Sequence, residues 1–310
     1  MRLLILGCGL LGASTALAAR ATGTAQTIIG VDPSPASVAA AGALGVFDRV
    51  ELLVEPQQAT TATPIPGLPI PGLKDTEQPI DIGVAAGPPS TLADSVRRLV
   101  GVCELVVDVG SVKAPVLASL ATTGSVPANY VPCHPMAGSE QAGAAAAQAD
   151  LFRNRQVFVT PADHCVPELC ARAHDFWRAL GANTSELTPQ AHDAAVAYTS
   201  HLPHLLASAY VGMDNPLPAA AGPGYHDFSR LAKANPVLWA DILTANRAQV
   251  LPLIEQLQAA LAEARAVLAT PDAAGQDGLV DYLTERQQAR ERVDVAGATA
   301  IAATEVPNPE

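Results

Sequence analysis

The stretch Gly7-Cys8-Gly9-Leu10-Leu11-Gly12 decides the fold of this chain. It follows the apolar run 3–6, which predicts a buried parallel strand, and it precedes an alanine-rich helix that runs to about Ala21. In a strand-turn-helix unit with G-x-G-x-x-G, the first glycine allows a tight turn and the second lets the backbone approach a pyrophosphate. The third glycine lets the helix pack closely on the strand. We therefore expect a dinucleotide to bind at Gly7, Gly9, Leu10, Leu11 and Gly12.

A carboxylate stands where such a unit would hold the ribose of the dinucleotide. The apolar run 27–31 predicts a second strand, and it ends at Asp32, which comes 20 residues after Gly12. A carboxylate there accepts hydrogen bonds from ribose hydroxyls and repels a 2′-phosphate, so NAD is expected rather than NADP. The alternative is a glycine turn without a ligand, which the combination of strand, glycines, helix and acid disfavours.

Further strands and helices alternate up to about residue 163. Apolar runs at 81–86, 105–108, 129–133 and 156–160 predict strands, the last of them closing the domain. This series predicts an α/β fold with an N-terminal doubly wound, Rossmann-type parallel sheet in residues 1–163. The proline-rich segment 56–79 interrupts it and is expected to be a surface insertion, because proline cannot continue a helix or a central strand.

The second part of the chain is expected to be helical. Apolar residues between Trp239 and Leu257 follow helical spacing, and Pro252 inside this run predicts a kink or a break. We expect a C-terminal all-helical domain over 164–292 that binds substrate and forms a homodimer, because long apolar helix faces need a covering surface. Residues 293–310 lack a strong pattern and are expected to form a poorly ordered tail.

Composition limits the class of protein. The 310 residues carry a formal net charge of −12 and are 49% hydrophobic, which describes a globular protein and disfavours nucleic acid as a partner. No run approaches the length of a membrane span. The five cysteines are irregularly spaced and lack the pattern of a zinc site, so free thiols, a cytoplasmic location and no bound metal are expected.

Two loops that follow predicted strands carry polar residues. Gly87-Pro88-Pro89-Ser90 and Asp108-Val109-Gly110-Ser111-Val112-Lys113 both stand after strands, and loops at the carboxyl ends of parallel strands line the ligand crevice. Gly87 and Ser111 are therefore expected beside the cofactor, and Lys113 near the substrate. The alternative for Ser111 is that it caps the following helix.

His134 is the predicted catalytic base. It lies in Cys133-His134-Pro135-Met136-Ala137-Gly138-Ser139-Glu140, at the end of the next predicted strand. A histidine beside a nicotinamide ring can take the proton of a substrate hydroxyl while the carbon gives up hydride. The alternative is a core histidine bonded to backbone. Glu140 either pairs with a cationic group or caps a helix that runs through Ala145.

Three further polar residues belong to the predicted helical domain. His201 and His204 are spaced three apart, but His192 and Asp193 offer no convincing set of additional metal ligands. His204 is expected to line the substrate pocket. Arg230, after the glycine-rich segment 222–229, offers a planar fork suited to a carboxylate; the alternative is a surface arginine.

The chain resembles the prephenate/arogenate dehydrogenases of tyrosine biosynthesis. The resemblance rests on the glycine fingerprint, on 108–113, on 134–140, on 200–204 and on Asp227-Phe228-Ser229-Arg230, and it spans Gly7 to about Asn246. His226 departs from the family pattern, which commonly has arginine or lysine there, and the proline-rich segment is also outside that pattern.

The resemblance implies an activity and a role for each matching residue. It implies NAD-dependent oxidative decarboxylation of prephenate, or of its amino counterpart arogenate. His134 would engage the ring hydroxyl with Ser111, His204 would line the pocket, Arg230 would bind a substrate carboxylate, and Glu140 would act in gating. The rival hypotheses are a non-catalytic NAD sensor and a 3-hydroxyacid dehydrogenase. The latter group relies on a catalytic lysine in its helical domain, and Lys233 of this chain stands in a different local setting.

Overall fold

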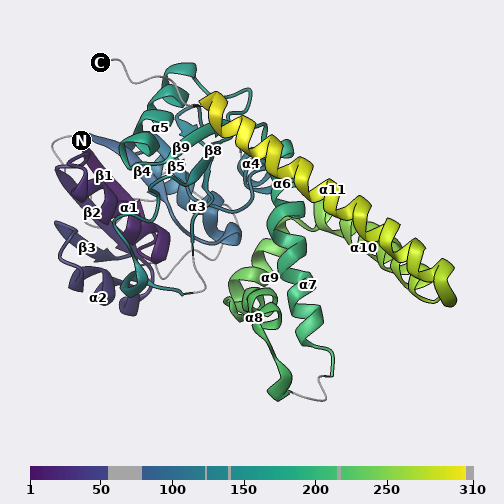
Figure 1. Cartoon of the computed structure of the whole chain (residues 1–310). Helices are drawn as coiled ribbons and strands as arrows, with labels where there is room; N and C mark the ends of the chain where they lie inside the picture. Colours follow the sequence, from purple (N-terminus) through teal and green to yellow (C-terminus); the bar gives the residue numbers. More distant parts are fainter. Residues whose placement is uncertain (55–78, 123, 139–140, 215–217, 305–310) are drawn as a thin grey trace. The chain divides into compact units, whose positions relative to one another are not determined.

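The computed structural model describes residues 1–54, 79–122, 124–138, 141–214 and 218–304 (Figure 1). The chain divides into two compact units, Met1–Val250 and Leu251–Glu310. The predicted proline-rich insertion at 56–79 lies outside the described residues, apart from its last residue. The predicted domain boundaries at 163 and 292 stay predictions.

The first unit is built on a six-stranded parallel sheet with the strand order β3-β2-β1-β4-β5-β6. Its strands are β1 (Arg2–Leu6), β2 (Thr27–Asp32), β3 (Arg49–Leu52), β4 (Ile80–Ala85), β5 (Cys103–Asp108) and β6 (Tyr130–Val131). The chain winds outward from β1 to β3 and then returns to place β4 on the other side of β1. This arrangement confirms the predicted doubly wound sheet, and β3 is a strand that the sequence analysis did not predict.

Helices cover both faces of this sheet because the strands are apolar on both sides. Leu3 and Ile5 belong to one buried cluster with α1 (Leu10–Ala21) and α5 (Pro167–Ala179). Leu4 and Leu6, which alternate with them, belong to a second cluster with α3 (Pro89–Leu99) and α4 (Ala114–Thr122). The period of two in β1 therefore decides which helices it contacts. A further helix, α2 (Pro35–Ala43), packs on β2 and β3.

A second, three-stranded sheet corrects three predictions. Its strands are β7 (Cys133–Pro135), β8 (Gln156–Val159) and β9 (Asn183–Glu186), with β7 antiparallel to β8. The predicted strand 129–133 is split at Pro132, which has no N–H for the ladder and whose carbonyl accepts from Thr160. The strand predicted at 156–160 joins this small sheet instead of the large one, and β9 interrupts the region that was expected to be helical.

The rest of the chain is helical, which confirms the predicted second part of the fold class. The helices are α6 (Pro189–Val196), the π-helical turn η3 (Ala197–His201), α7 (Leu202–Val211), α8 (Pro223–Ser229), α9 (Pro236–Ala245), α10 (Arg247–Leu268) and α11 (Asp272–Thr304). The short turns η4 (Pro218–Ala220) and η5 (Arg230–Lys233) stand between them, and a further turn, η2 (Ala144–Ala146), lies earlier in the chain between β7 and β8.

The helix break predicted at Pro252 occurs at Asn246 instead. Asn246 ends α9, and its side-chain amide donates to the carbonyl of Asp193 at 2.8 Å, so its position is fixed by a distant contact. Pro252 lies inside α10. The segment expected to be a poorly ordered tail is helical as far as Thr304, and residues 305–310 lie outside the described residues.

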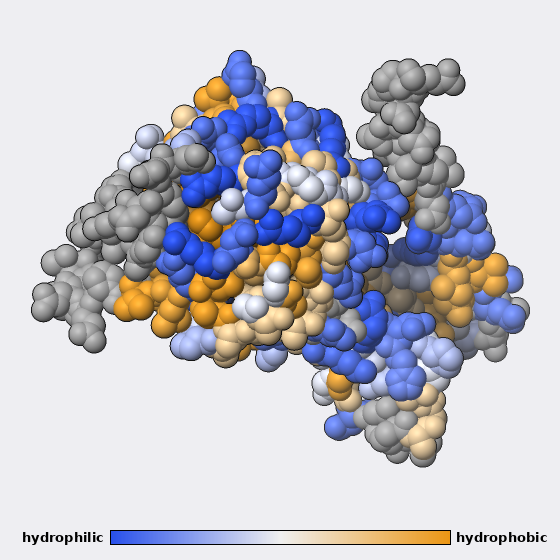
Figure 2. All heavy atoms as spheres, turned by 90° about the vertical axis from the view of Figure 1, so that its left-hand side faces the viewer, coloured by the Kyte–Doolittle hydropathy of each residue, from blue (hydrophilic) through white to orange (hydrophobic). Residues whose placement is uncertain are grey.

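Hydrophilic and apolar residues are interleaved over the face shown in Figure 2. Exposed apolar side chains include Leu52, in β3, and Val54, which follows it. Within the described part of the chain, none of the helices combines the length and the apolar character that crossing a membrane requires.

A buried ion pair joins the large sheet to the small one. Asp108, at the end of β5, pairs with Lys113, and both side chains are fully buried. Asp108 also accepts a hydrogen bond from the backbone N–H of Cys133 at 2.6 Å, while the Lys113 ammonium donates to the Cys133 carbonyl at 2.7 Å. These contacts fix the first residue of β7, and so the position of His134 that follows it.

Replacing Lys113 with methionine should destabilise the fold by about 3–5 kcal/mol, because it leaves the Asp108 carboxylate buried without a counter-charge. The free energy of unfolding in urea, followed by tryptophan fluorescence, measures the change. Lys233→Met is the matched control, since Lys233 is exposed. A Lys113→Met protein as stable as that control would show that the pair does not hold β7 in place.

Candidate active site

The glycine loop leaves an open space at the N-terminus of α1. Gly7 has a φ of +103°, and a Cβ there would lie 2.6 Å from the carbonyl oxygen of Ala86. A Cβ on Gly12 would lie 1.9 Å from the Gly7 oxygen, so only glycine lets the helix pack on the turn. A Cβ on Gly9 would meet nothing within 4 Å. Gly9 is the N-cap of α1, and helix N-termini with free N–H groups bind phosphates.

Asp32 lies beside this loop as predicted. Its carboxylate accepts hydrogen bonds from the N–H of Cys8 at 2.7 Å and of Ser34 at 2.8 Å. Each carboxylate oxygen has a second acceptor position, so ribose hydroxyls can still bind there. Burial and the Asp32 charge raise the pKa of Cys8 to about 12, which keeps it a thiol in the turn. The open space at Gly9 and the carboxylate at Asp32 together fit an adenosine diphosphate group.

The loops carrying Gly87 and Ser111 lie at the same edge of the sheet. Gly87 follows β4 and Ser111 follows β5, and both residues are half-buried. Beyond Gly87, the backbone N–H of Ser90 donates to the Asp241 carboxylate of α9 at 2.9 Å. The polar loops therefore meet the helical part of the chain at the point where the strand order reverses, the usual place for a ligand in such sheets.

His134 lies in the middle of β7 rather than at the end of a strand of the main sheet. It pairs with Phe158 of β8 in the antiparallel ladder and is only 8% exposed. Its Nδ1 lies 2.8 Å from Nε2 of His192 in α6. Nδ1 of His192 lies in turn 2.8 Å from a carboxylate oxygen of Asp193. His134 is therefore not a histidine bonded only to backbone, because its ring contacts the side chain of His192.

The environment of His134 keeps its ring neutral. Burial lowers the pKa of His134 well below its usual value, and the neighbouring His192, Lys113 and His201 lower it further. A neutral imidazole can accept a proton at near-neutral pH, as a general base requires.

Two further histidines complete the cluster. His201, in the π-helical turn η3, is fully buried, and burial lowers its pKa to about 4. Its Nδ1 lies 3.0 Å from the amide nitrogen of Asn246. His204 stacks on Trp239, with ring centroids 3.6 Å apart and planes 1° from parallel. The stack fixes the orientation of the His204 ring, which was predicted to line the pocket.

Three predicted substrate residues lie in different settings. Lys113 is fully buried and engaged with Asp108 and Cys133, and its charge acts on His134; its place in the substrate site stays a prediction. Arg230 begins η5, is exposed, and belongs to an element that packs against α7, which carries His204. Glu140 lies outside the described residues.

The contacts of His192, Asp193, Asn246 and Trp239 with site residues are not predicted by the sequence patterns. From the sequence, His192 and Asp193 are considered only as metal ligands, although both are buried and bonded to site residues. The available signal was two adjacent titratable residues in the middle of a short, mostly apolar helix that follows the N-cap Thr188. Among the residues that the structure describes, no group of three or more histidine, cysteine or acidic side chains is placed to hold a metal.

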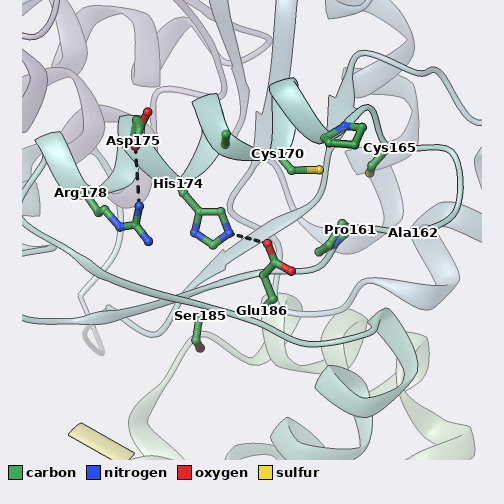
Figure 3. Close-up of a pocket in the computed structure, with 11 residues that line it drawn as sticks. Pro161, Ala162, Cys165, Cys170, His174, Asp175, Arg178, Ser185 and Glu186 are labelled. Carbon is green, nitrogen blue, oxygen red and sulfur yellow. Dashed lines mark hydrogen bonds and ion pairs between the residues drawn. The ribbon is translucent and has the colours of Figure 1, made fainter. Parts of the chain in front are cut away.

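A separate cavity of about 660 Å³ lies beside α5 and β9 (Figure 3). It is lined by Cys165, Cys170 and by an ion pair between His174 and Glu186 at 2.9 Å. None of the predicted site residues lines it. The five cysteines of the chain are free thiols.

Comparisons with known proteins place this geometry in one family. The family model described as "Prephenate dehydrogenase, nucleotide-binding domain" matches residues 73–186, and "Prephenate dehydrogenase, dimerization domain" matches residues 188–285. A cyclohexadienyl dehydrogenase of Zymomonas mobilis is 29% identical over 92% of this chain and 94% of its own. A prephenate dehydrogenase of Bacillus subtilis is 30% identical over 82% of this chain and 66% of its own.

Solved structures agree. Prephenate dehydrogenase from A. aeolicus, in complex with hydroxyphenyl propionate and NAD+, superposes with a TM-score of 0.77 at 26% identity. That match covers 94% of this chain and 98% of the other. Synechocystis arogenate dehydrogenase has the same fold, with a TM-score of 0.70 at 23% identity over 94% of this chain and all of its own, at 100%.

Proposed function

Because this chain belongs to the prephenate dehydrogenase family, whose members are oxidoreductases, we propose that it converts prephenate to 4-hydroxyphenylpyruvate with NAD+. One observation carries the proposal: His134 is a neutral, buried imidazole held by His192 in a sheet next to the nucleotide-binding loops. A protein that only sensed NAD would need no such base. That favours the enzyme over the sensor.

The nucleotide-binding residues support NAD+ as the cofactor. Gly7, Gly9, Leu10, Leu11 and Gly12 would hold the pyrophosphate at the N-terminus of α1. Asp32 would bind the ribose and repel a 2′-phosphate. Gly87 and Ser111 would lie beside the nicotinamide half. When bound, NAD+ would supply the acceptor for hydride.

His134 would accept the proton of the ring hydroxyl and later return it. It accepts this proton as the carbon that bears the hydroxyl loses hydride, and it can return the proton to the phenolate oxygen that forms. The bond between the ring and its carboxylate breaks, carbon dioxide leaves, and the electron pair completes the aromatic ring. Protons therefore balance without another donor. Ser111 would help to hold the hydroxyl in place.

The rest of the substrate needs a cationic side chain for its carboxylate and a polar wall for the pocket. Arg230 can grip a carboxylate with two parallel hydrogen bonds, which a dianionic substrate needs in a chain with a net charge of −12. His204, oriented by Trp239, would line the pocket, and Glu140 would act in gating. Arogenate is the alternative substrate. It has the same ring and ring carboxylate as prephenate, so the roles proposed for Arg230, His204 and Glu140 would be unchanged.

We also propose that the protein is a cytoplasmic homodimer. The matching family model for residues 188–285 is described as a dimerization domain. Large apolar side chains are exposed in this part of the chain, among them Tyr198, Met213 and Val237. A second copy would cover them.

Turnover should be highest for prephenate with NAD+. The experiment supplies prephenate or arogenate with NAD+ or NADP+ and follows reduced nicotinamide by absorbance. The four values of kcat/KM separate the choice of substrate from the choice of cofactor. A higher value for arogenate would correct the substrate, and no turnover with any pair would reject the enzyme.

Replacing His134 with asparagine should lower kcat by about 10²–10⁴-fold, because the general base is lost. NAD+ binding, measured by calorimetry, should be unchanged, since His134 does not belong to the glycine loop. His164→Asn is the control, because His164 bonds the carbonyl of Tyr130 and lies outside the cluster. Retained turnover in His134→Asn would remove His134 from the mechanism.

Replacing Gly9 with alanine should weaken NAD+ binding about tenfold, or about 1.4 kcal/mol, while the melting temperature stays unchanged. The added methyl group meets no protein atom within 4 Å, but it occupies the space left for the pyrophosphate. Gly42→Ala is the matched control, because its methyl group also meets nothing and lies in α2. Wild-type affinity in Gly9→Ala would place the cofactor elsewhere.

A further inference from the structure

The side chains behind His134 form a directional chain of hydrogen bonds. It begins at Asp193, whose carboxylate accepts from the backbone N–H of Lys113 and of Ala114, both at 2.9 Å. It continues through His192 to His134, with a separation of 2.8 Å at each contact. These side chains are buried: His192 is fully enclosed, Asp193 is 2% exposed and His134 is 8% exposed.

The directions of these bonds follow from which atoms can donate. An ionised carboxylate only accepts, so Nδ1 of His192 carries a proton and donates to Asp193. A neutral His192 then has a lone pair on Nε2, and Nδ1 of His134 must donate to it. This leaves Nε2 of His134 without a proton. A doubly protonated His192 would reverse the last bond, but it would place a second positive charge in a buried site next to Lys113.

We infer that Asp193 and His192 are positioning residues that hold His134 in the tautomer with its proton on Nδ1 and its Nε2 lone pair free to act as the base. The inference rests on the proposed function only in assuming that this lone pair accepts the proton of the substrate hydroxyl. Neither residue is assigned a contact with the substrate. Both act by deciding which nitrogen of His134 can accept the hydroxyl proton, as a buried aspartate does for the histidine of serine hydrolases.

The same chain stabilises His134 after it accepts the proton. The imidazolium keeps its Nδ1–H bond to His192, so the positive charge forms next to a lone pair backed by the Asp193 carboxylate. The other groups that face or surround the ring are the Asp108–Lys113 pair, His201 of η3 and the apolar ring of Phe158. Of the described residues, His192 is the one that hydrogen-bonds Nδ1 of His134, and Asp193 acts on His134 through His192.

Asp193 also connects the base to the loop of Ser111. The two N–H groups from which it accepts belong to Lys113 and Ala114, at the start of α4 and two and three residues after Ser111. One carboxylate therefore fixes both the tautomer of His134 and the backbone that carries Ser111, which we propose to hold the same hydroxyl.

The central test replaces Asp193 with asparagine. An amide that turns its NH₂ toward His192 would force the proton of His192 to Nε2 and that of His134 to Nε2, where the lone pair is needed. We expect kcat to fall about 10⁴-fold, as the same exchange does in a serine protease, and KM to rise as well, because Asp193 also holds the backbone that follows Ser111. The loss should persist across the pH range, because a tautomer does not depend on pH.

A matched pair at His192 protects the test from a folding defect. In His192→Gln the amide can still donate to Asp193 and accept from His134, whereas His192→Leu has a similar volume and does neither. We expect His192→Gln to retain about a tenth of kcat or more, and His192→Leu to lose about as much as Asp193→Asn. Equal kcat values in the two His192 variants would overturn the inference.

A spectroscopic measurement separates this inference from the proposed function. In ¹⁵N-histidine protein, with His134→Asn used for assignment, the His134 resonances should show a proton on Nδ1 in the wild type and on Nε2 in Asp193→Asn. A wild-type Nε2–H tautomer overturns the inference even if prephenate is oxidised. The expected tautomer in a protein that oxidises neither substrate would support the positioning and reject the proposed function alone.

Discussion

The Asp193 carboxylate is the interaction on which the site depends. It is buried, it accepts from two backbone N–H groups at the start of α4, and it contacts His192, which contacts His134. A buried carboxylate is stable only when its acceptor positions are filled, and here the donors are the backbone that follows Ser111 and His192, which holds the base. Removing this one group would therefore disturb two parts of the site that lie far apart in the sequence.

A second buried charge, Lys113, supports the same arrangement from the other side. Its pair with Asp108 fixes Cys133 through both backbone groups, and it contributes to lowering the pKa of His134. Buried ion pairs add little net stability, since desolvation offsets the attraction, but they favour one geometry over its alternatives. In this chain the geometry that is favoured is the position of β7. We therefore interpret the Asp108–Lys113 pair as a contact that selects this position of β7 over others.

The sequence predicted the local features of the fold and of the cofactor loop. Gly7, Gly9 and Gly12 and the apolar strands are local patterns, and the structure confirms the parallel sheet that they indicate. The split at Pro132, the strand β9 and the break at Asn246 depend on contacts with distant residues, which a local pattern does not contain. The burial of Lys113 could not be predicted for the same reason, because its partner Asp108 cannot be recognised from spacing alone.

The low basicity of His134 suits the proposed reaction. A base whose pKa lies well below its usual value is ready to accept a proton at every near-neutral pH, but it is a weak acceptor. That weakness matters little if the hydroxyl becomes acidic as hydride leaves its carbon, and if loss of carbon dioxide with formation of an aromatic ring then prevents reversal. Orientation, and not basicity, then limits the step. The buried chain from Asp193 through His192 supplies this orientation. Two backbone N–H groups hold Asp193, Asp193 holds His192, and His192 holds the imidazole of His134. These contacts orient the ring and do not need to raise its pKa.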